Sequence, residues 1–224
     1  MFVNVKKFPY VVMEQVGRPT HVVEVGTFNP LDLEVLPFVF DTSCRVQLFE
    51  PQPDCAERLI EFFKKAEFRH IEITQVAIGA AFAQTTLYVP VPTRNNPDAA
   101  ASAFLSTESP YRVRSQAGKE VEELKSIRVS VEPLSAFDDG TIQALSIDVE
   151  GAEWEVLSTL VSRPAVISIE LWGQEGYVTP GLVQIEHWMA QNGYTLHDRT
   201  ETDAIYIFEE MPVELNRLEG IEHG

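Results

Sequence analysis

Acidic side chains gather in the segment LSIDVEGAEWEVLSTL, where Asp148, Glu150, Glu153 and Glu155 fall within eight positions. Carboxylates in the first turn of a helix are stabilised by the helix dipole, which is a sufficient reason for Glu155 and one of two open explanations for Glu153. Asp148 precedes the expected helix, so the dipole does not explain it. A carboxylate in that position can remove a proton from a substrate or bind a hard cation.

A second pair of acidic residues follows strand-like segments near the N-terminus. Glu24 and Gly26 end the apolar segment 21–25, and Glu50 ends the next one, 24 positions after Gly26. In doubly wound folds the first strand-to-helix turn approaches the cofactor, and an acidic residue after the second strand accepts hydrogen bonds from the ribose hydroxyls. We therefore predict a nucleoside-containing cofactor. The alternatives are an ordinary tight turn at Gly26 and a solvated strand end at Glu50.

These side chains must be positioned by a sheet, and the sequence predicts one. Apolar strand-like segments alternate with segments of helical periodicity, which is typical of a mostly parallel sheet covered by helices on both faces. The last two strands are expected to form an antiparallel hairpin. The predicted strands are 21–25, 45–50, 71–78, 85–91, 127–131, 144–149, 165–172, 194–197 and 204–208, and the predicted helices cover 31–40, 54–63 (opened by Asp54 and Glu57 as a capping pair), 154–161 and 182–189.

Length and charge limit the classes of function. The 224 residues predict a short lead-in, 1–20, and one domain, 21–224. A net charge of −17 argues against a nucleic-acid partner, which would need clustered Lys and Arg. The sequence has no apolar run of membrane-spanning length, no signal peptide and only two cysteines, so we expect a cytoplasmic protein without a membrane partner. The oligomeric state is left open.

The segment 92–119 has no periodicity, and its charged residues are four cations and two acids, a local balance of 4 − 2 = +2. Loops of this length are usually functional or disordered. Arg112 and Arg114 are therefore candidates for binding an anionic acceptor, and a solubilising loop is the alternative.

Several motifs occur together in one order, and together they resemble the FkbM family of S-adenosylmethionine (SAM)-dependent O-methyltransferases. The similarity extends over residues 21–210, and its most specific part is the block Ile147–Glu153. The motifs are Val-Glu-Val-Gly at 23–26, Phe-Glu-Pro at 49–51, Val-Ala-Ile-Gly at 76–79, Ile-Asp-Val-Glu-Gly-Ala-Glu at 147–153 and the strand 166–170.

The resemblance implies a Rossmann-like class I methyltransferase fold with a mostly parallel seven-stranded sheet and a C-terminal antiparallel hairpin. It also implies SAM as cofactor and methylation of a hydroxyl group on a sugar or a glycosylated small molecule. Transferred to this sequence, the cofactor-binding residues are Glu24, Gly26, Thr27 and Asn29 toward the methionine end, Glu50 on the ribose, and Gln75 and Ala77 along the adenine, with Asp148 beside the methyl group.

One position departs from the family pattern. The second glycine of the family's loop is replaced by Pro30, which fixes φ and lacks an N–H group. This substitution leaves an alternative function open, namely a degenerate, non-catalytic domain that binds a ligand or a partner. A nicotinamide oxidoreductase is disfavoured because no Gly-x-Gly-x-x-Gly run follows the first strand.

Methyl transfer to an alcohol requires in-line placement of the acceptor and removal of its proton. Asp148 is the candidate catalytic base. Because Glu170 ends the neighbouring strand, Asp148 and Glu170 are also candidate ligands for Mg²⁺, and the sequence does not decide between base and metal.

Overall fold

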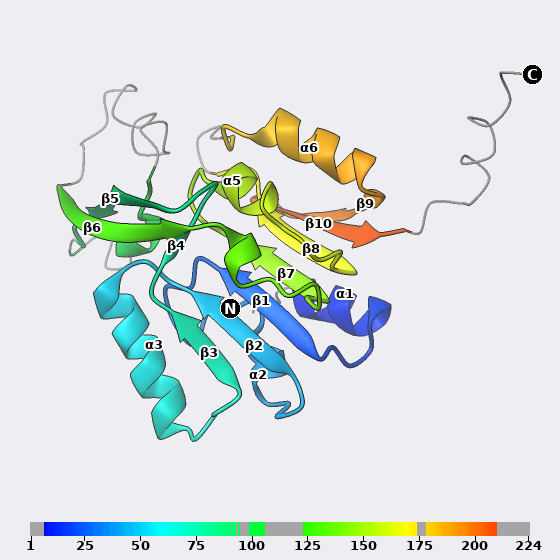
Figure 1. Ribbon diagram of the computed structural model, residues 1–224, viewed down its shortest axis with the longest axis horizontal. Coiled ribbons are helices and arrows are strands. Elements are labelled where there is room, and N and C mark those ends of the chain that lie inside the picture. Colours follow the sequence, from blue (N-terminus) through cyan, green and yellow to red (C-terminus); the bar gives the residue numbers. More distant parts are fainter. Residues whose placement is uncertain (1–6, 93, 95–98, 106–122, 174–177, 210–224) are drawn as a thin grey trace, which may run out of the picture.

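The computed structural model describes residues 7–92, 94, 99–105, 123–173 and 178–209 of the chain (Figure 1). Two sheets and their flanking helices make up this part. The elements are α1 (Phe8–Gln15), β1 (His21–Val25), α2 (Leu36–Val39), β2 (Arg45–Phe49), α3 (Pro53–Lys65), β3 (Ile71–Thr74), β4 (Ala77–Ile78), β5 (Ala83–Pro90), η1 (Ala99–Ser102), β6 (Leu124–Glu132), η2 (Leu134–Ala136), β7 (Ala144–Ile147), α5 (Glu153–Leu157), β8 (Val166–Glu170), α6 (Leu182–Gln191), β9 (Tyr194–Arg199) and β10 (Asp203–Phe208).

The larger sheet has seven strands in the order β3-β2-β1-β7-β8-β10-β9. Within this sheet β3, β2, β1, β7 and β8 are parallel, and β10 pairs antiparallel with both β8 and β9, so the mostly parallel sheet and its terminal hairpin are confirmed. The chain runs outward from β1 to β3 and returns to β7 on the other side of β1. The boundary between β1 and β7 is therefore the topological switch point, where open α/β sheets bind ligands.

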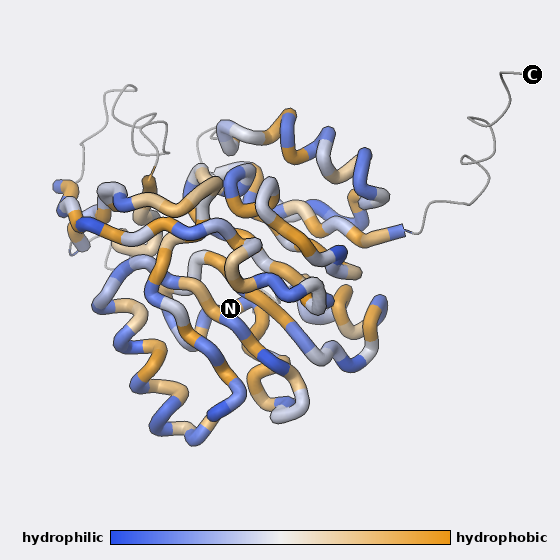
Figure 2. The backbone as a smooth tube through the Cα atoms, in the orientation of Figure 1, coloured by the Kyte–Doolittle hydropathy of each residue, from blue (hydrophilic) through white to orange (hydrophobic). Residues whose placement is uncertain are grey.

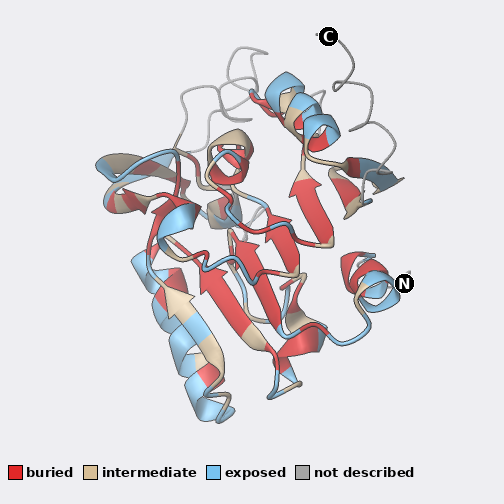
Figure 3. Cartoon of the chain, turned by 45° about the vertical axis from the view of Figure 1, so that its right-hand side comes forward, coloured by how far each residue is buried: buried red, intermediate tan, exposed pale blue. Residues whose placement is uncertain are grey.

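Apolar cores cover both faces of this sheet. Successive side chains of a strand point to opposite faces, so each central strand contributes to both cores. In β1, Val23 and Val25 belong to a core formed with α5 and α6, whereas Val22 belongs to a second core formed with α1, α2 and α3. All five residues of β1 are buried, and Figure 3 shows the central strands as almost entirely buried.

Helix α3 is amphipathic, as its periodicity predicts. Its inward residues Cys55, Leu59 and Phe63 are buried, and Figure 2 shows the alternation of apolar and polar positions along it. The predicted capping pair at its start is wrong. The helix begins at Pro53, and the preceding Gln52 makes no capping hydrogen bond with its side chain. Proline suits the first turn of a helix because no N–H group is needed there.

The predicted strand 71–78 is divided between two sheets. Strand β3 pairs with β2 in the large sheet, whereas β4 pairs with β6 in a separate three-stranded sheet of order β4-β6-β5. The small sheet has its own apolar core, to which Leu87, Val129 and Val131 contribute. The alternation of strands predicted the β-structure of these segments but not their separation from the main sheet.

Two further segments differ from the prediction. The helix expected over 31–40 is reduced to the four residues of α2, and Thr27–Val35 has no regular structure. The lead-in contains α1, whose Phe8 and Val12 are buried in the second core. None of the helices in the described ranges is long and apolar enough to cross a membrane.

Candidate functional site

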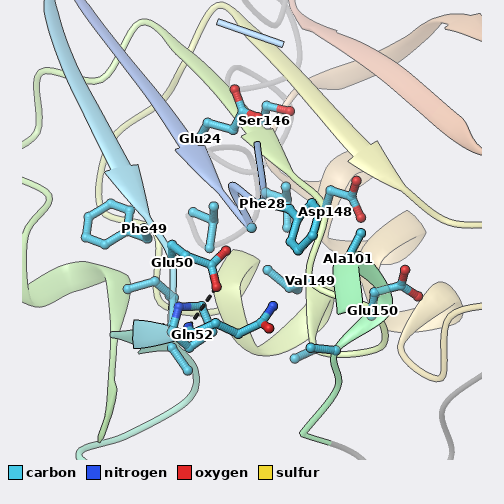
Figure 4. A pocket seen from close by; sticks show the side chains of 18 of the residues that line it. Glu24, Phe28, Phe49, Glu50, Gln52, Ala101, Ser146, Asp148, Val149 and Glu150 are labelled. Carbon is cyan, nitrogen blue, oxygen red and sulfur yellow. Dashed lines mark hydrogen bonds between the residues drawn. The ribbon is translucent and has the colours of Figure 1, made fainter. Parts of the chain in front are cut away.

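A cavity opens at the carboxyl ends of β1, β2 and β7, next to the switch point (Figure 4). Its wall combines carboxylates with an apolar patch that includes Val76, Ala77, Ile78 and Leu87. Among the described residues that line it there is no Lys, Arg or His. Seven of them are acidic: Glu24, Asp32, Glu34, Glu50, Asp148, Glu150 and Asp203.

Gly26 brings two strand ends into contact. It adopts φ 93°, which side chains disfavour, and a Cβ atom on it would lie 1.7 Å from the backbone oxygen of Asp148. The N–H group of Gly26 donates to the Phe49 carbonyl at 3.0 Å, and that of Asp148 donates to the Val25 carbonyl at 2.9 Å. Only glycine fits this position, because the backbone of Asp148 fills the space that a Cβ atom would need.

Glu50 faces the cavity from the end of β2, opposite the turn that carries Asp148 and Glu150 (Figure 4). One of its carboxylate oxygens accepts the N–H group of Gln52 at 2.7 Å. Its exposed fraction is 3%, and this burial raises the pKa of Glu50 to about 8, although the nearby Arg58 acts in the opposite direction. The side chain therefore presents a carboxyl group with high proton affinity to the cavity.

The other predicted cofactor residues divide into two groups. Glu24, Asn29 and Ala77 lie on the cavity wall, and Glu24 also accepts the N–H group of Val35 at 3.0 Å. Thr27 and Gln75 do not reach the wall. Thr27 is buried with its hydroxyl donating to the Phe49 carbonyl at 3.4 Å, and Gln75 is exposed at the break between β3 and β4.

The predicted Asp148 and Glu170 come together, and Glu150 joins them. Carboxylate oxygens of the three residues lie within 4.8 Å of one another. Asp148 is exposed, whereas Glu150 and Glu170 are partly buried. Burial and the neighbouring negative charges raise the pKa of Glu170 far above its ordinary value, and its carboxyl group is hydrogen-bonded to Asp148. This group can hold a proton between two carboxylates, or it can bind a divalent cation through oxygen.

Sequence reasoning missed Glu150 as a member of this group. Its backbone has φ 56°, followed by φ 106° at Gly151, so the chain turns sharply after Asp148 and returns the Glu150 side chain to the cavity. The Glu-Gly dipeptide was the available signal, because a glycine after a strand permits such a turn.

Glu153 differs from the expectation of a helix-dipole residue. Its exposed fraction is 0%, and its carboxylate accepts the N–H group of Gly151 at 2.8 Å and the hydroxyl of Thr179. Burial raises the pKa of Glu153 to about 7. The two remaining predicted residues, Arg112 and Arg114, lie outside the described part of the chain.

A model of the methyltransferase FkbM domain matches residues 18–196. The chain belongs to the FkbM methyltransferase family. It is therefore a SAM-dependent methyltransferase, and this assignment favours the enzyme over the non-catalytic module.

Solved structures show the same fold for this FkbM methyltransferase. Cofactor-bound Rv0187 from MTB is 12% identical, with TM-score 0.51, 94% of this chain and 83% of that chain covered. A putative rRNA-methylase from Clostridium thermocellum is 10% identical, with TM-score 0.50, 94% of this chain and 99% of that chain covered. No curated protein matches the sequence.

The carboxylate-lined cavity fits SAM in charge. SAM carries a sulfonium and an ammonium group against one carboxylate, so it is a net cation. Seven acidic residues without a lining Lys, Arg or His among the described residues give a negative potential that attracts such a ligand, even with Glu50 protonated below about pH 8. The apolar patch at 76–78 offers a surface for a planar base.

The raised pKa of Glu50 predicts a pH dependence of stability in the cofactor-free FkbM methyltransferase. The folded pKa, about 8, is above the ordinary value of 4.5, so the folded state binds the proton more tightly than the unfolded state does. This contribution to stability is fully present below pH 4.5 and is lost as the pH rises through about 8.

Glu50→Gln carries no such proton. We expect the free energy of unfolding of the wild type, relative to this variant, to fall across that pH window by up to about 1.4 kcal/mol per pH unit. Urea denaturation of both proteins at several pH values measures the difference. A difference that stays constant with pH would show that Glu50 titrates normally.

Proposed function

We propose that this enzyme transfers the methyl group of SAM to a hydroxyl group of a sugar or a glycosylated small molecule. The observation that carries the proposal is the exposed Asp148 carboxylate on the wall of the cofactor cavity, grouped with Glu150 and Glu170. A hydroxyl acceptor must lose its proton, and a carboxylate is a suitable base. A sugar offers several hydroxyl groups, which neighbouring carboxylates bind as hydrogen-bond acceptors.

The proposed cofactor position follows the wall of the cavity. Glu50 accepts hydrogen bonds from the ribose hydroxyls, and the patch 76–78 contacts the adenine. The methionine end of SAM lies near Glu24 and Gly26, where the turns after β1 and β7 meet. This placement directs the methyl group toward Asp148 and leaves Glu150 and Glu170 for the acceptor.

Asp148 then has two tasks in the reaction. It orients the acceptor hydroxyl in line with the bond between sulfur and the methyl carbon, and it accepts the hydroxyl proton as the new bond forms. Orientation supplies much of the rate of such a displacement, because the reacting atoms no longer have to find each other in solution.

A screen with isotope-labelled SAM tests the acceptor class. Neutral sugars, uronic acids and sugar phosphates are offered separately, together with non-sugar alcohols. We expect label in at least one sugar-containing product, with the methyl group on oxygen. Transfer only to a non-sugar acceptor would contradict the proposal.

Replacing Glu50 by Ala tests the cofactor position. We expect SAM to bind about 1.5–3 kcal/mol more weakly, the usual scale for losing hydrogen bonds to a charged group. Isothermal titration calorimetry measures the dissociation constant. Glu57, exposed on α3 and absent from the cavity wall, provides the matched control as Glu57→Ala. An unchanged dissociation constant in Glu50→Ala would place the ribose elsewhere.

The catalytic role of Asp148 predicts a large kinetic effect. Asp148→Asn keeps the size of the side chain but removes its basicity, so we expect kcat to fall about 10²-fold or more with the fold intact. Steady-state kinetics with the acceptor from the screen, together with circular dichroism, give both quantities. Near-wild-type kcat in this variant would exclude Asp148 as the base.

The same three carboxylates are candidate ligands for Mg²⁺, which would bind the acceptor oxygen and favour its deprotonated form. Because the exposed Asp148 carboxylate is a sufficient base by itself, we expect the reaction to proceed without a metal ion. Activity after treatment with EDTA and gel filtration should therefore be retained. Loss of activity that Mg²⁺ restores, with Glu170→Gln as defective as Asp148→Asn, would assign the metal site instead.

A further inference from the structure

The turn after β7 has an unfavourable backbone conformation. Glu150 and Gly151 both have positive φ, 56° and 106°, and glutamate rarely adopts this region. Such residues persist where surrounding contacts determine the conformation, and they cluster at functional sites. The turn carries Asp148 and Glu150 on the cavity wall, so the contacts that hold it also set the position of the acceptor carboxylates.

The buried carboxylate of Glu153 supplies these contacts. One oxygen accepts the N–H group of Gly151 at 2.8 Å, directly beside the unfavourable residue. The other accepts the hydroxyl of Thr179. A single side chain therefore connects the turn after β7 to the segment that follows β8.

Thr179 is itself fixed to the end of β8. It is 2% exposed, and its N–H group donates to the Leu171 carbonyl at 2.9 Å, one residue beyond Glu170. The neighbouring Gly181 packs so closely on α5 that a Cβ atom there would lie 2.4 Å from the Cβ atom of Trp154. The segment is thus held against both β8 and α5, and it provides a rigid partner for Glu153.

A carboxylate without solvent exposure destabilises a fold unless its oxygens are hydrogen-bonded. An apolar residue at the start of α5 would cover the same core without this cost. The bonds of Glu153 have a different consequence, because they join the two chain segments that bring Asp148 and Glu150 to Glu170.

We propose that Glu153 and Thr179 form a clasp that positions Asp148 and Glu150 for methyl transfer. Glu153 is a positioning residue, since it has no surface with which to touch SAM or acceptor. The inference rests on the proposed function for its kinetic consequence, whereas its structural part concerns the turn alone.

Thr179→Val tests the clasp with little change in size. Glu153→Ala is avoided, because removing a fully buried side chain leaves a cavity in the protein. Thr179→Ser restores the hydroxyl and is the conservative variant. Thr159→Val is the control for losing a threonine hydroxyl, because the Thr159 hydroxyl donates to the Val156 carbonyl at 3.0 Å and accepts the N–H group of Leu134 at 3.0 Å, but does not contact the turn.

Three quantities are measured in each variant: hydrogen exchange of the Gly151 amide, the SAM dissociation constant, and kcat with the acceptor from the screen. In Thr179→Val we expect exchange to be about tenfold faster, because the carboxylate that binds this amide loses its second anchor. We expect kcat to fall about tenfold or more, with SAM affinity within about twofold of wild type. In Thr179→Ser the exchange rate and kcat should both lie within about threefold of wild type, and Thr159→Val should alter neither of them.

Unchanged exchange and unchanged kcat in Thr179→Val would overturn the clasp. So would a kcat defect that Thr179→Ser does not restore, or one that Thr159→Val shares. If the wild-type enzyme methylates no sugar, the proposed acceptor class fails, and the exchange of the Gly151 amide still decides whether Thr179 holds the turn.

Discussion

The contact between Gly26 and the backbone of Asp148 is the constraint on which the site depends. The turn after β1 and the turn after β7 approach so closely that any side chain at position 26 would overlap the Asp148 carbonyl, which would lie 1.7 Å from a Cβ atom. The close approach follows from the parallel pairing of β1 with β7, in which Val25 lies opposite Ile147. Because the two turns touch, the proposed cofactor residues after β1 and the carboxylates after β7 share one cavity. The family's glycine at this position is thus explained by sterics, independently of any ligand.

Negative charge in a partly enclosed cavity is the second constraint. Three carboxyl groups at or beside the cavity, those of Glu50, Glu153 and Glu170, have pKa values raised chiefly by burial. Protons held by such groups limit the repulsion among the acidic residues when the cavity contains only water. A cationic cofactor lowers the same repulsion by its own charge, so cofactor binding and proton release are expected to be linked. The acidic composition of the chain, with a net charge of −17, therefore has a local counterpart in the site.

Much of the fold was predictable because the central strands and α3 have unambiguous patterns. Strand β1 was predicted with the observed bounds, and β2 differs only at Glu50, which leaves the strand to face the cavity. Local patterns do not predict which sheet a strand joins. The segment 71–78 has the pattern of a single strand, although β3 and β4 pair with different partners. Local sequence also did not predict which of two similar carboxylates is buried. Glu153 and Glu155 both fit the first turn of a helix, and only tertiary packing buries Glu153 beneath Thr179.

Pro30 does not lie where its position in the family pattern suggested. In the family pattern a glycine at this place lets the backbone approach the cofactor, and a proline there argued for a defective site. Here the loop does not continue into a helix, and Pro30 lies on the wall of a neighbouring cleft formed with α3 and the small sheet, outside the wall of the cavity at the switch point. The loop is shaped by hydrogen bonds instead, since Asn29 accepts the N–H group of Leu31 and Glu24 accepts that of Val35. Because Pro30 is not on the wall of this cavity, its missing N–H group does not remove a donor from the proposed cofactor site.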